Sequence, residues 1–420
     1  MKINTVMNKK VLLFAALLGI SAGGFAQKKG FSYKFYGQVR TDVFYNSRAN
    51  SETVDGLFYM YPKNVAPDAM GNDLNDYMNS GFYMLYSRLG VDIAGPMIGN
   101  KIKTSAKVEV DFRGSGTTYS LFRMRHVYFN LNFGKSDLLV GQTWHPLYGD
   151  VAPEILNLNM GAPYQPFSRA PQIRYRFTSP NFMLTAAAVW QSQYLSVGPK
   201  SNAAGETGTA KSQNFIKNSG VPEVYVGVDG KFNGLMLGVG GHVSSMVPRT
   251  QSETEGKVYK VSERITSVSA EAHLKYKKEK LFVAAKTVLG SNLTQTSTVG
   301  GYGITSIDKI TGEQSYTPLR ASHTWFNVMY GTKWRAGIFG GYLKNLGATE
   351  NVVSVLGTGT DLDQLLTGSF ELTYNLPNWK FGVEYSWVGA YYGSLTEKGK
   401  VTDTNLVDNH RAVLTAIFQF

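Results

Sequence analysis

Arginine pairs separated by one position recur in the first half of the chain. Arg123 and Arg125 form one pair, and Arg174 and Arg176 form another. Guanidinium groups stay charged and present a planar fork to carboxylates and phosphates. If such groups surround a pore, they favour the passage of anions. Further candidates for this set are Arg40, Arg88 and Arg113.

Acidic residues on the same segments give a second interpretation. Asp42, Asp92, Glu109 and Asp111 lie on the same predicted strands as the arginines. Ion pairs between the two sets would neutralise the wall and leave a transverse field rather than an anion filter. Residues 122–128 also break the clean alternation, so a bulge there would redirect one arginine of the first pair.

The segment 145–170 lies between the two arginine pairs and carries groups that interact with ions. It contains His145, Asp150, Glu154 and Arg169, together with four of the chain's 14 prolines. Its composition is that of a long loop. Such a loop either lies in solvent or, if it enters a lumen, places its polar groups beside the wall.

Other chemistry has little support in the sequence. The six histidines are scattered, and the chain has no Cys, which excludes thiolate metal sites and cysteine nucleophiles. His273 near Ser267 and Ser269 resembles a catalytic group, but with Glu271 and Lys275 it reads more simply as the polar face of a strand. We expect no enzyme, metal site or cofactor. Since the basic residues are dispersed, we also expect no nucleic-acid binding.

Composition and the first residues indicate an exported β protein. Charged residues make up 17% of the 420 residues, below the roughly 25% of soluble domains, and aromatic residues reach 13%. Lys9–Lys10 precedes a short apolar stretch, Val11–Ile20, and the small residues Gly24 and Ala26 are placed for cleavage before Gln27. This is the pattern of a signal peptide. We expect cleavage of residues 1–26 and a single domain over 27–420.

Alternation with a period of two residues dominates the rest of the chain. Between Trp379 and Trp387 every odd position is large and apolar, and Lys101–Phe112 alternates in the same way. This period is typical of strands. The sequence predicts about sixteen, near 33–45, 82–94, 101–113, 121–133, 136–144, 171–178, 182–193, 223–231, 235–246, 263–276, 280–290, 323–330, 334–343, 364–374, 379–392 and 410–420.

The connections alternate between long and short, which is typical of outer-membrane β-barrels. Apart from a modest one at 114–120, the long connections are predicted near 46–81, 145–170, 194–222, 247–262, 291–322, 344–363 and 393–409. A closed sheet leaves no unpaired edge in lipid, and a barrel of this size leaves an aqueous channel. The pattern therefore predicts an all-β transmembrane antiparallel barrel with a polar lumen and an apolar outer face. On the first strand, Phe35, Val39 and Val43 should face lipid, while Arg40 and Asp42 face inward.

The last strand has an apolar face that ends in a terminal aromatic residue. Phe418 and Phe420 lie on this face. It resembles the terminal strand of bacterial outer-membrane barrels, which the barrel-assembly machinery recognises. We therefore expect these two residues to act as an assembly signal.

Three segments resemble the DcaP-like porins. Arg123–Tyr128 is similar to the family's RxRHAY-type strand, with Val127 where Ala is usual. Leu139–Trp144 is similar to its vGQtw strand, and Arg169–Arg176 to its R-PqiRy strand. The N-terminal coiled coil of some members is absent, because Lys28 leads almost directly into the first strand.

The resemblance implies a sixteen-stranded porin in a bacterial outer membrane. It implies a water-filled channel for small hydrophilic solutes, narrowed by an inward-folded loop at 145–170, and the arginines described above favour anionic ones. Implied partners are these solutes, outer-membrane lipid and lipopolysaccharide, the assembly machinery and two further copies in a homotrimer. An alternative is a surface binding or adhesion protein that acts through its long loops. Conductance across a planar bilayer distinguishes the two.

Overall fold

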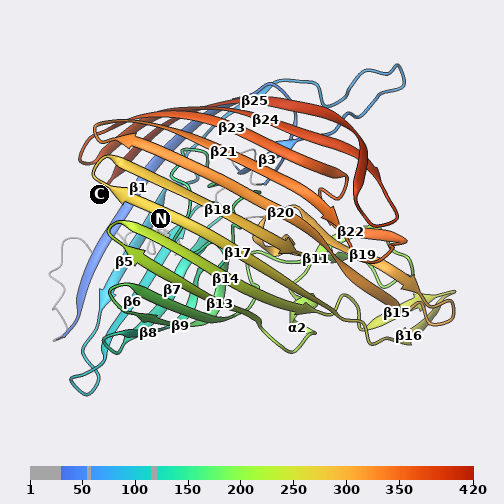
Figure 1. The fold of residues 1–420 in the computed structure, drawn as a ribbon, viewed down its shortest axis with the longest axis horizontal. Coiled ribbons are helices and arrows are strands. Elements are labelled where there is room, and N and C mark those ends of the chain that lie inside the picture. Colours follow the sequence, from blue (N-terminus) through green and yellow to red (C-terminus); the bar gives the residue numbers. More distant parts are fainter. Residues whose placement is uncertain (1–29, 54–57, 115–120) are drawn as a thin grey trace, which may run out of the picture.

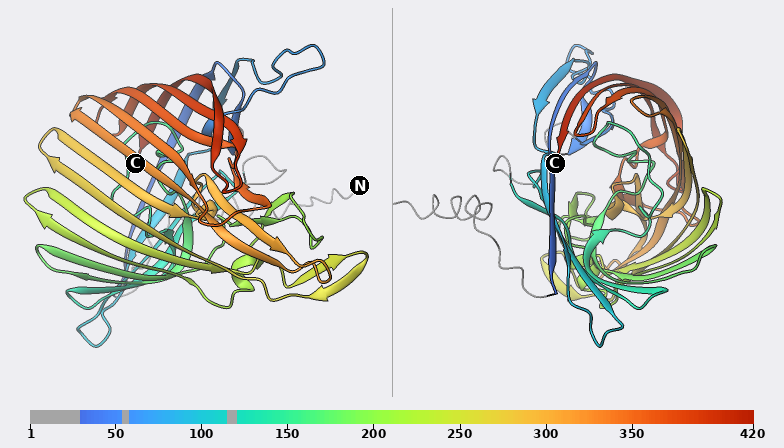
Figure 2. Two further views of the ribbon diagram at one scale, coloured as in Figure 1. Left: turned by 45° about the vertical axis from the view of Figure 1, so that its right-hand side comes forward. Right: turned by 90° about the vertical axis from the view of Figure 1, so that its left-hand side faces the viewer.

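The computed structural model describes residues 30–53, 58–114 and 121–420. In these residues an antiparallel sheet of sixteen strands closes into a barrel (Figures 1 and 2). Neighbours in the barrel are neighbours in the chain, and the first strand pairs with the last. The predicted fold class is therefore confirmed. The signal peptide predicted at 1–26 lies outside the described residues.

The barrel strands match the predicted strands to within a few residues at most ends. They are β1 (Ser32–Asn46), β4 (Asn79–Tyr83) with β5 (Arg88–Ala94), β6 (Lys103–Asp111), β7 (Arg123–Asn132), β8 (Ser136–Trp144), β9 (Arg169–Thr178), β10 (Phe182–Val189), β13 (Glu223–Phe232), β14 (Leu235–Met246), β17 (Ile265–Lys278), β18 (Leu281–Ser291), β20 (Gln314–Gly331), β21 (Trp334–Gly347), β23 (Leu362–Asn375), β24 (Trp379–Leu395) and β25 (Val401–Gln419).

Short turns and long loops occupy opposite ends of the barrel, on the left and right of Figure 1. The long loops carry short elements of their own: β2 (Asn50–Thr53), β3 (Phe58–Pro62), β11 (Val197–Pro199), β12 (Thr209–Lys211), α2 (Asn214–Lys217), β15 (Gln251–Thr254), β16 (Lys257–Lys260), η2 (Thr294–Thr296), β19 (Gly300–Ile307) and β22 (Ser354–Thr358). Within the described ranges, no helix has the length and apolar character needed to cross a bilayer.

Three predicted boundaries are wrong. The strand expected at 323–330 begins already at Gln314, so the loop expected at 291–322 is shorter. The strand expected at 82–94 is broken at residues 84–87, where both Leu85 and Tyr86 turn into the barrel and are buried. The loop expected at 393–409 is mostly strand, because β24 and β25 continue as a hairpin around a turn at 396–400. Most of residues 402–406 are polar and all are exposed, so they lack the apolar alternation that marks the strands lower in the wall.

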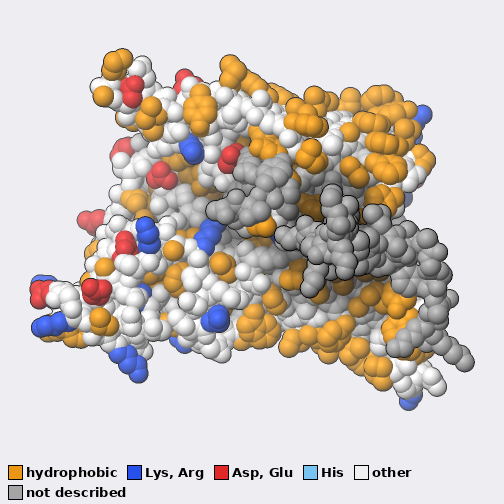
Figure 3. Space-filling view, turned by 180° about the vertical axis from the view of Figure 1, so that it is seen from behind, with side chains coloured by type: hydrophobic (Ala, Val, Ile, Leu, Met, Phe, Trp, Pro, Cys, Tyr) orange, Lys and Arg blue, Asp and Glu red, His pale blue; other side chains and the backbone are white. Residues whose placement is uncertain are grey.

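The outer surface of the barrel is apolar. Phe35, Val39 and Val43 are 65%, 51% and 42% exposed, while Arg40 and Asp42 are buried on the inner side, as the alternation predicts. Hydrophobic side chains gather along the strands, and charged ones gather toward the long loops (Figure 3). Exposed aromatic residues near the short turns form a girdle suited to a membrane interface; they include Tyr33, Phe133, Phe232, Tyr330, Trp334 and Trp379.

The chain end completes the closure of the barrel. The Phe420 carbonyl accepts a hydrogen bond from the Gly37 amide at 2.9 Å, and the Phe420 amide donates to the Gly37 carbonyl at 3.2 Å. The Phe420 ring lies over Gly37, where a Cβ would approach it to 2.6 Å. Phe418 stacks near Trp379, with 4.8 Å between ring centroids. The last residues therefore join β1 and β24 at the turn end of the barrel.

Replacing Phe420 by Asp should lower the amount of assembled barrel severalfold. The substitution removes the aromatic contact at Gly37 and places a charge on the apolar outer face, where charges are unfavourable. Heat-modifiable migration of the membrane fraction measures assembly, and Phe420→Tyr serves as the control. Wild-type levels of folded Phe420→Asp would contradict the prediction.

Candidate functional site

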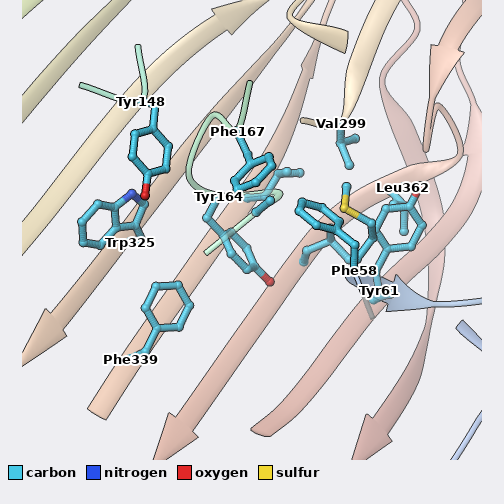
Figure 4. Close-up of a cluster of buried hydrophobic side chains, with 14 of the residues drawn as sticks. Phe58, Tyr61, Tyr148, Tyr164, Phe167, Val299, Trp325, Phe339 and Leu362 are labelled. Carbon is cyan, nitrogen blue, oxygen red and sulfur yellow. The ribbon is translucent and has the colours of Figure 1, made fainter. Parts of the chain in front are cut away.

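Residues 145–168, which we call the inner loop, lie inside the barrel (Figure 2, right). The loop leaves β8 and packs against the inner face of β18, β20, β21, β23 and β24. Tyr148 and Tyr164 point from the loop toward the wall residues Trp325 and Phe339, while Phe167 packs edge-on against Phe58 of β3 (Figure 4). Each buried side chain of this kind contributes about 1.5–3 kcal/mol by removing apolar area from water. The loop is thus fixed by a hydrophobic cluster within the lumen.

Small residues in the wall create room for the loop. Gly341 on β21 receives the Tyr164 ring, since a Cβ at this position would lie 2.5 Å from the ring. Gly382 on β24 receives Leu156 in the same way, at 2.6 Å. The wall therefore fits the loop at two separate points.

Buried charges in the wall hold the backbone of the loop. The Glu384 carboxylate accepts from the Leu156 amide at 2.8 Å and from the Asn157 amide at 3.0 Å. The Lys286 ammonium donates to the Leu147 carbonyl at 2.7 Å. Charge-assisted bonds of this kind are about twice as strong as neutral ones. They orient the loop as well as anchor it.

Replacing Gly341 by Leu should displace Tyr164 into the lumen and lower single-channel conductance. The added side chain occupies the space that the Tyr164 ring fills, so this part of the loop must lift from the wall. Gly368→Leu is the matched control, because Gly368 lies on neighbouring β23 with nothing within 4 Å of its Cβ position. Equal conductance in both variants would show that the Tyr164 contact does not set the width of the passage.

Five arginines and two carboxylates form what we call the basic cluster, on the side of the barrel where β5, β6, β7 and β9 lie. Arg125 is 2.6 Å from Glu109 and 3.0 Å from Asp111, and Arg123 is 2.5 Å from Asp111. Arg88 lies farther from Glu109, at 3.7 Å. The members are Arg88, Glu109, Asp111, Arg113, Arg123, Arg125 and Arg169.

Arg113 and Arg169 have no acidic partner within ion-pair distance in the described part of the chain, although both are fully buried. Arg169 lies 4.5 Å from the centre of the Trp144 ring and donates to the Tyr194 hydroxyl at 3.0 Å. Arg113, just beyond β6, packs on Tyr86. Burial and the nearby Arg123 lower the pKa of Arg113 to about 10, which leaves it protonated at neutral pH. The basic cluster therefore holds surplus positive charge.

A cavity of about 590 Å³ adjoins the basic cluster. Arg113, Arg123 and Lys211 contribute its charged lining, and none of the described residues that line it is acidic. Tyr194 and Gln295 add polar groups from two long loops. Its chemistry suits a small anion with an apolar part.

The second arginine pair has a different setting. Arg176 lies 3.1 Å from Asp150 of the inner loop, and both side chains are partly exposed. Arg174 forms no ion pair among the described residues. Arg40 is paired with Asp42 at 2.7 Å and also donates to the inner loop at the Leu156 carbonyl. These residues lie outside the basic cluster.

The remaining predicted loop residues also contact the wall. Glu154 is 2.5 Å from Arg335 on β21, and His145 lies against Glu223 on β13. Burial lowers the pKa of His145, so this imidazole is neutral at neutral pH. The structure therefore divides the predicted site residues among several contacts rather than gathering them into one ring.

The suspected irregularity in β7 is present. Glu109 pairs with His126 and Val110 with Met124, so Arg125 is an extra residue in the strand. This bulge lets Arg125 and His126 both face inward, where both are buried. The sequence shows that the alternation of apolar and polar residues is interrupted here. It does not show which residue changes the side of the strand on which it lies.

The structure does not bring His273 and Ser267 together into a catalytic group. His273 is hydrogen-bonded to Asp229 at 2.7 Å. Ser267 lies six residues earlier in the same strand, roughly 20 Å away at strand spacing. The two side chains therefore do not meet.

Several contacts at the site were missed by sequence reasoning. Tyr86 and Tyr194 pack between the arginines, while Lys286, Glu371 and Glu384 bind the loop backbone. The signal for Glu384 was its even position in an alternating strand, which places it inside. Nothing in the sequence linked it to residues 156–157.

Comparisons with known proteins agree on the fold. No family model matches the chain, and no curated protein matches it in sequence. The crystal structure of the outer membrane channel DcaP of Acinetobacter baumannii matches with a TM-score of 0.62 at 17% identity, covering 95% of this chain and 100% of that one.

Two further solved structures match over nearly the same range. The trimer form of OmpT, an outer membrane protein of Vibrio cholerae, has a TM-score of 0.53 at 12% identity, with 93% of this chain and 100% of that chain covered. An anion-selective porin from Comamonas acidovorans has a TM-score of 0.52 at 11% identity, with the same two coverages. Together with the closed barrel and its apolar outer face, these matches show that the chain has the fold of the outer-membrane porins.

Proposed function

We propose that the protein is an outer-membrane porin whose water-filled channel favours small hydrophilic anions, dicarboxylates among them. The surplus positive charge of the basic cluster carries this proposal. Its charged side chains are five arginines and two carboxylates, and the charged residues among the described lining of the adjoining cavity are all basic. A fixed charge between low-dielectric walls acts strongly on a passing ion. Local anion concentration rises accordingly.

The narrowest point of the channel lies, in this proposal, where the inner loop meets the basic cluster. Contacts at this junction support the placement. Tyr148 of the loop stacks on Trp144, which also lies beneath Arg169, and Leu158 packs against Tyr86. A solute passing the loop would therefore encounter guanidinium groups and aromatic faces together.

The zero-current potential in a salt gradient tests the proposal. Refolded protein in a planar bilayer should conduct, with a potential of the sign expected for anion preference. This preference should weaken at high salt, since the screening length falls from about 10 Å at 0.1 M to about 3 Å at 1 M. Cation preference would overturn the anion assignment. Folded protein without conductance would instead favour the surface binding or adhesion role.

The ends and the outer surface of the chain suit export to the outer membrane and contacts with partners there. The signal peptide at 1–26 would direct export, and the apolar face and aromatic girdle would contact outer-membrane lipid and lipopolysaccharide. Phe418 and Phe420 would be read by the barrel-assembly machinery. A homotrimer is the proposed assembly, and the trimer form of the Vibrio cholerae protein is one observation that supports it.

A further inference from the structure

A buried group of two imidazoles and one carboxylate lies where the inner loop begins. It consists of His145 at the start of the loop, Glu223 on β13 and His242 on β14. The Glu223 Oε2 atom is 3.3 Å from His145 Nε2 and 2.9 Å from His242 Nε2. All three side chains are at most 2% exposed. The group is therefore closed off from bulk solvent.

The charge of Glu223 is not balanced by a strong base. In the described part of the chain no Lys or Arg lies within ion-pair distance of this carboxylate. Its other contacts are the amides of Gln191 at 2.7 Å and Gln295 at 3.2 Å. Taking an ionised carboxylate out of water is costly unless a charge compensates it. A bound cation would supply that charge.

Unsatisfied polar atoms also surround this group. His242 Nδ1 and Gln295 Oε1 are buried without a hydrogen-bond partner. A metal-bound imidazole carries its proton on the nitrogen that does not bind the metal. The free Nδ1 of His242 is compatible with that form. The Gln295 side-chain nitrogen now faces Glu223. Exchanging the amide oxygen and nitrogen of Gln295 by a rotation of about 180° would place the oxygen there instead, where it can bind a cation.

We propose that His145, Glu223 and His242 bind one divalent transition metal ion of the zinc type, with the Gln295 oxygen as a further ligand. Two imidazole nitrogens and a carboxylate oxygen suit such an ion, and ligands about 2.0–2.1 Å from a tetrahedral centre lie roughly 3.3 Å apart. The two separations from Glu223, 3.3 and 2.9 Å, are close to this value, and all three ligand atoms lie within 4.8 Å of one another. Binding replaces the hydrogen bonds that the two imidazoles and the Gln295 amide make to Glu223. It also displaces the bond from the Leu147 amide to His145 Nδ1, which is long at 3.2 Å.

The ion would fasten the first residue of the inner loop to two wall strands and to η2. Its ligands are 78 residues apart in one pair and 19 in another. This explains why the histidine spacing in the sequence predicts no metal site. The inference is independent of the solute that the channel passes, because it concerns how the loop is held.

Metal content of the full chain tests the inference. Refolded protein in detergent is stripped with EDTA, incubated with Zn²⁺ or Co²⁺, desalted and analysed by mass spectrometry of the metal. Wild type should retain one zinc ion per chain, and the cobalt form should show the visible absorption of a tetrahedral centre. His242→Gln and Glu223→Gln should lose both signals. His323→Gln is the matched control, since His323 is equally buried but bonded to the Pro163 carbonyl.

The measurement also has an outcome that overturns the inference. Substoichiometric zinc in folded wild type, with a thermal midpoint that Zn²⁺ does not raise relative to His242→Gln, would show a hydrogen-bonded cluster only. If the variants do not assemble, the stoichiometry and cobalt spectrum of wild type decide the question by themselves. Bilayer selectivity is not a readout here, so failure of the anion proposal leaves this test unaffected.

Discussion

Replacing Arg113 and Arg169 together by Gln should lower the anion-to-cation permeability ratio by about threefold or more at 0.1 M salt. A unit charge about 8 Å from a passing ion is worth about 2 kcal/mol at an effective dielectric constant of about 20, and screening reduces this by roughly half. Among the described residues neither arginine has an acidic partner within ion-pair distance, so their removal orphans no described carboxylate in the wall. The zero-current potential in a KCl gradient measures the change.

Arg174→Gln with Arg176→Gln is the matched comparison. It removes the same number of charges, but Arg176 is already paired with Asp150. We expect a shift of the same sign and smaller size. Removing Arg125 is less informative, because it would leave Glu109 and Asp111 short of a buried partner. A wild-type potential in the Arg113 and Arg169 variant would refute the anion filter.

Shortening the inner loop should raise single-channel conductance severalfold and change selectivity less. Replacing residues 150–164 by a short Gly-Ser linker removes most of the chain segment that crosses the lumen. The basic cluster lies mainly on the wall strands, so it stays in place. Conductance and zero-current potential from the same bilayer separate the two effects.

The deletion exposes apolar wall residues such as Trp325 and Phe339, which lowers stability. Gly341→Leu tests the same idea while keeping the loop. If both variants fold and neither changes conductance, the inner loop does not limit the flow of ions. If selectivity changes as much as conductance, charges on the loop itself contribute to the filter.

The sequence by itself determined the barrel. Alternation at Trp379–Trp387 and along the first strand identifies strands with one apolar and one polar face. Since lipid provides no hydrogen-bond partners, such strands must close into a ring. Because long and short connections alternate along the chain, all the long loops lie at one end of the barrel and all the short turns at the other. These inferences depend only on the period of the strand and on the solvent, so one sequence is sufficient.

The inner face was less predictable than the outer one. Trp325 and Phe339 are buried inside the barrel, where the alternation predicts polar residues. They are apolar because the inner loop covers them and excludes water from that part of the wall. Nothing in β20 or β21 indicates that segment 145–168, far away in the chain, packs there.

Only the tertiary structure decided which charged groups are paired. The sequence left open whether Arg123 and Arg125 are free or paired; in the structure they contact Glu109 and Asp111, whereas Arg113 and Arg169 have no acidic partner among the described residues. The same holds for His145 and His242, which meet at Glu223. Ion pairing changes over a few ångströms, and these separations follow from strand register, the bulge at Arg125 and the path of the loop. Strand periodicity fixes the face a residue occupies but none of these distances.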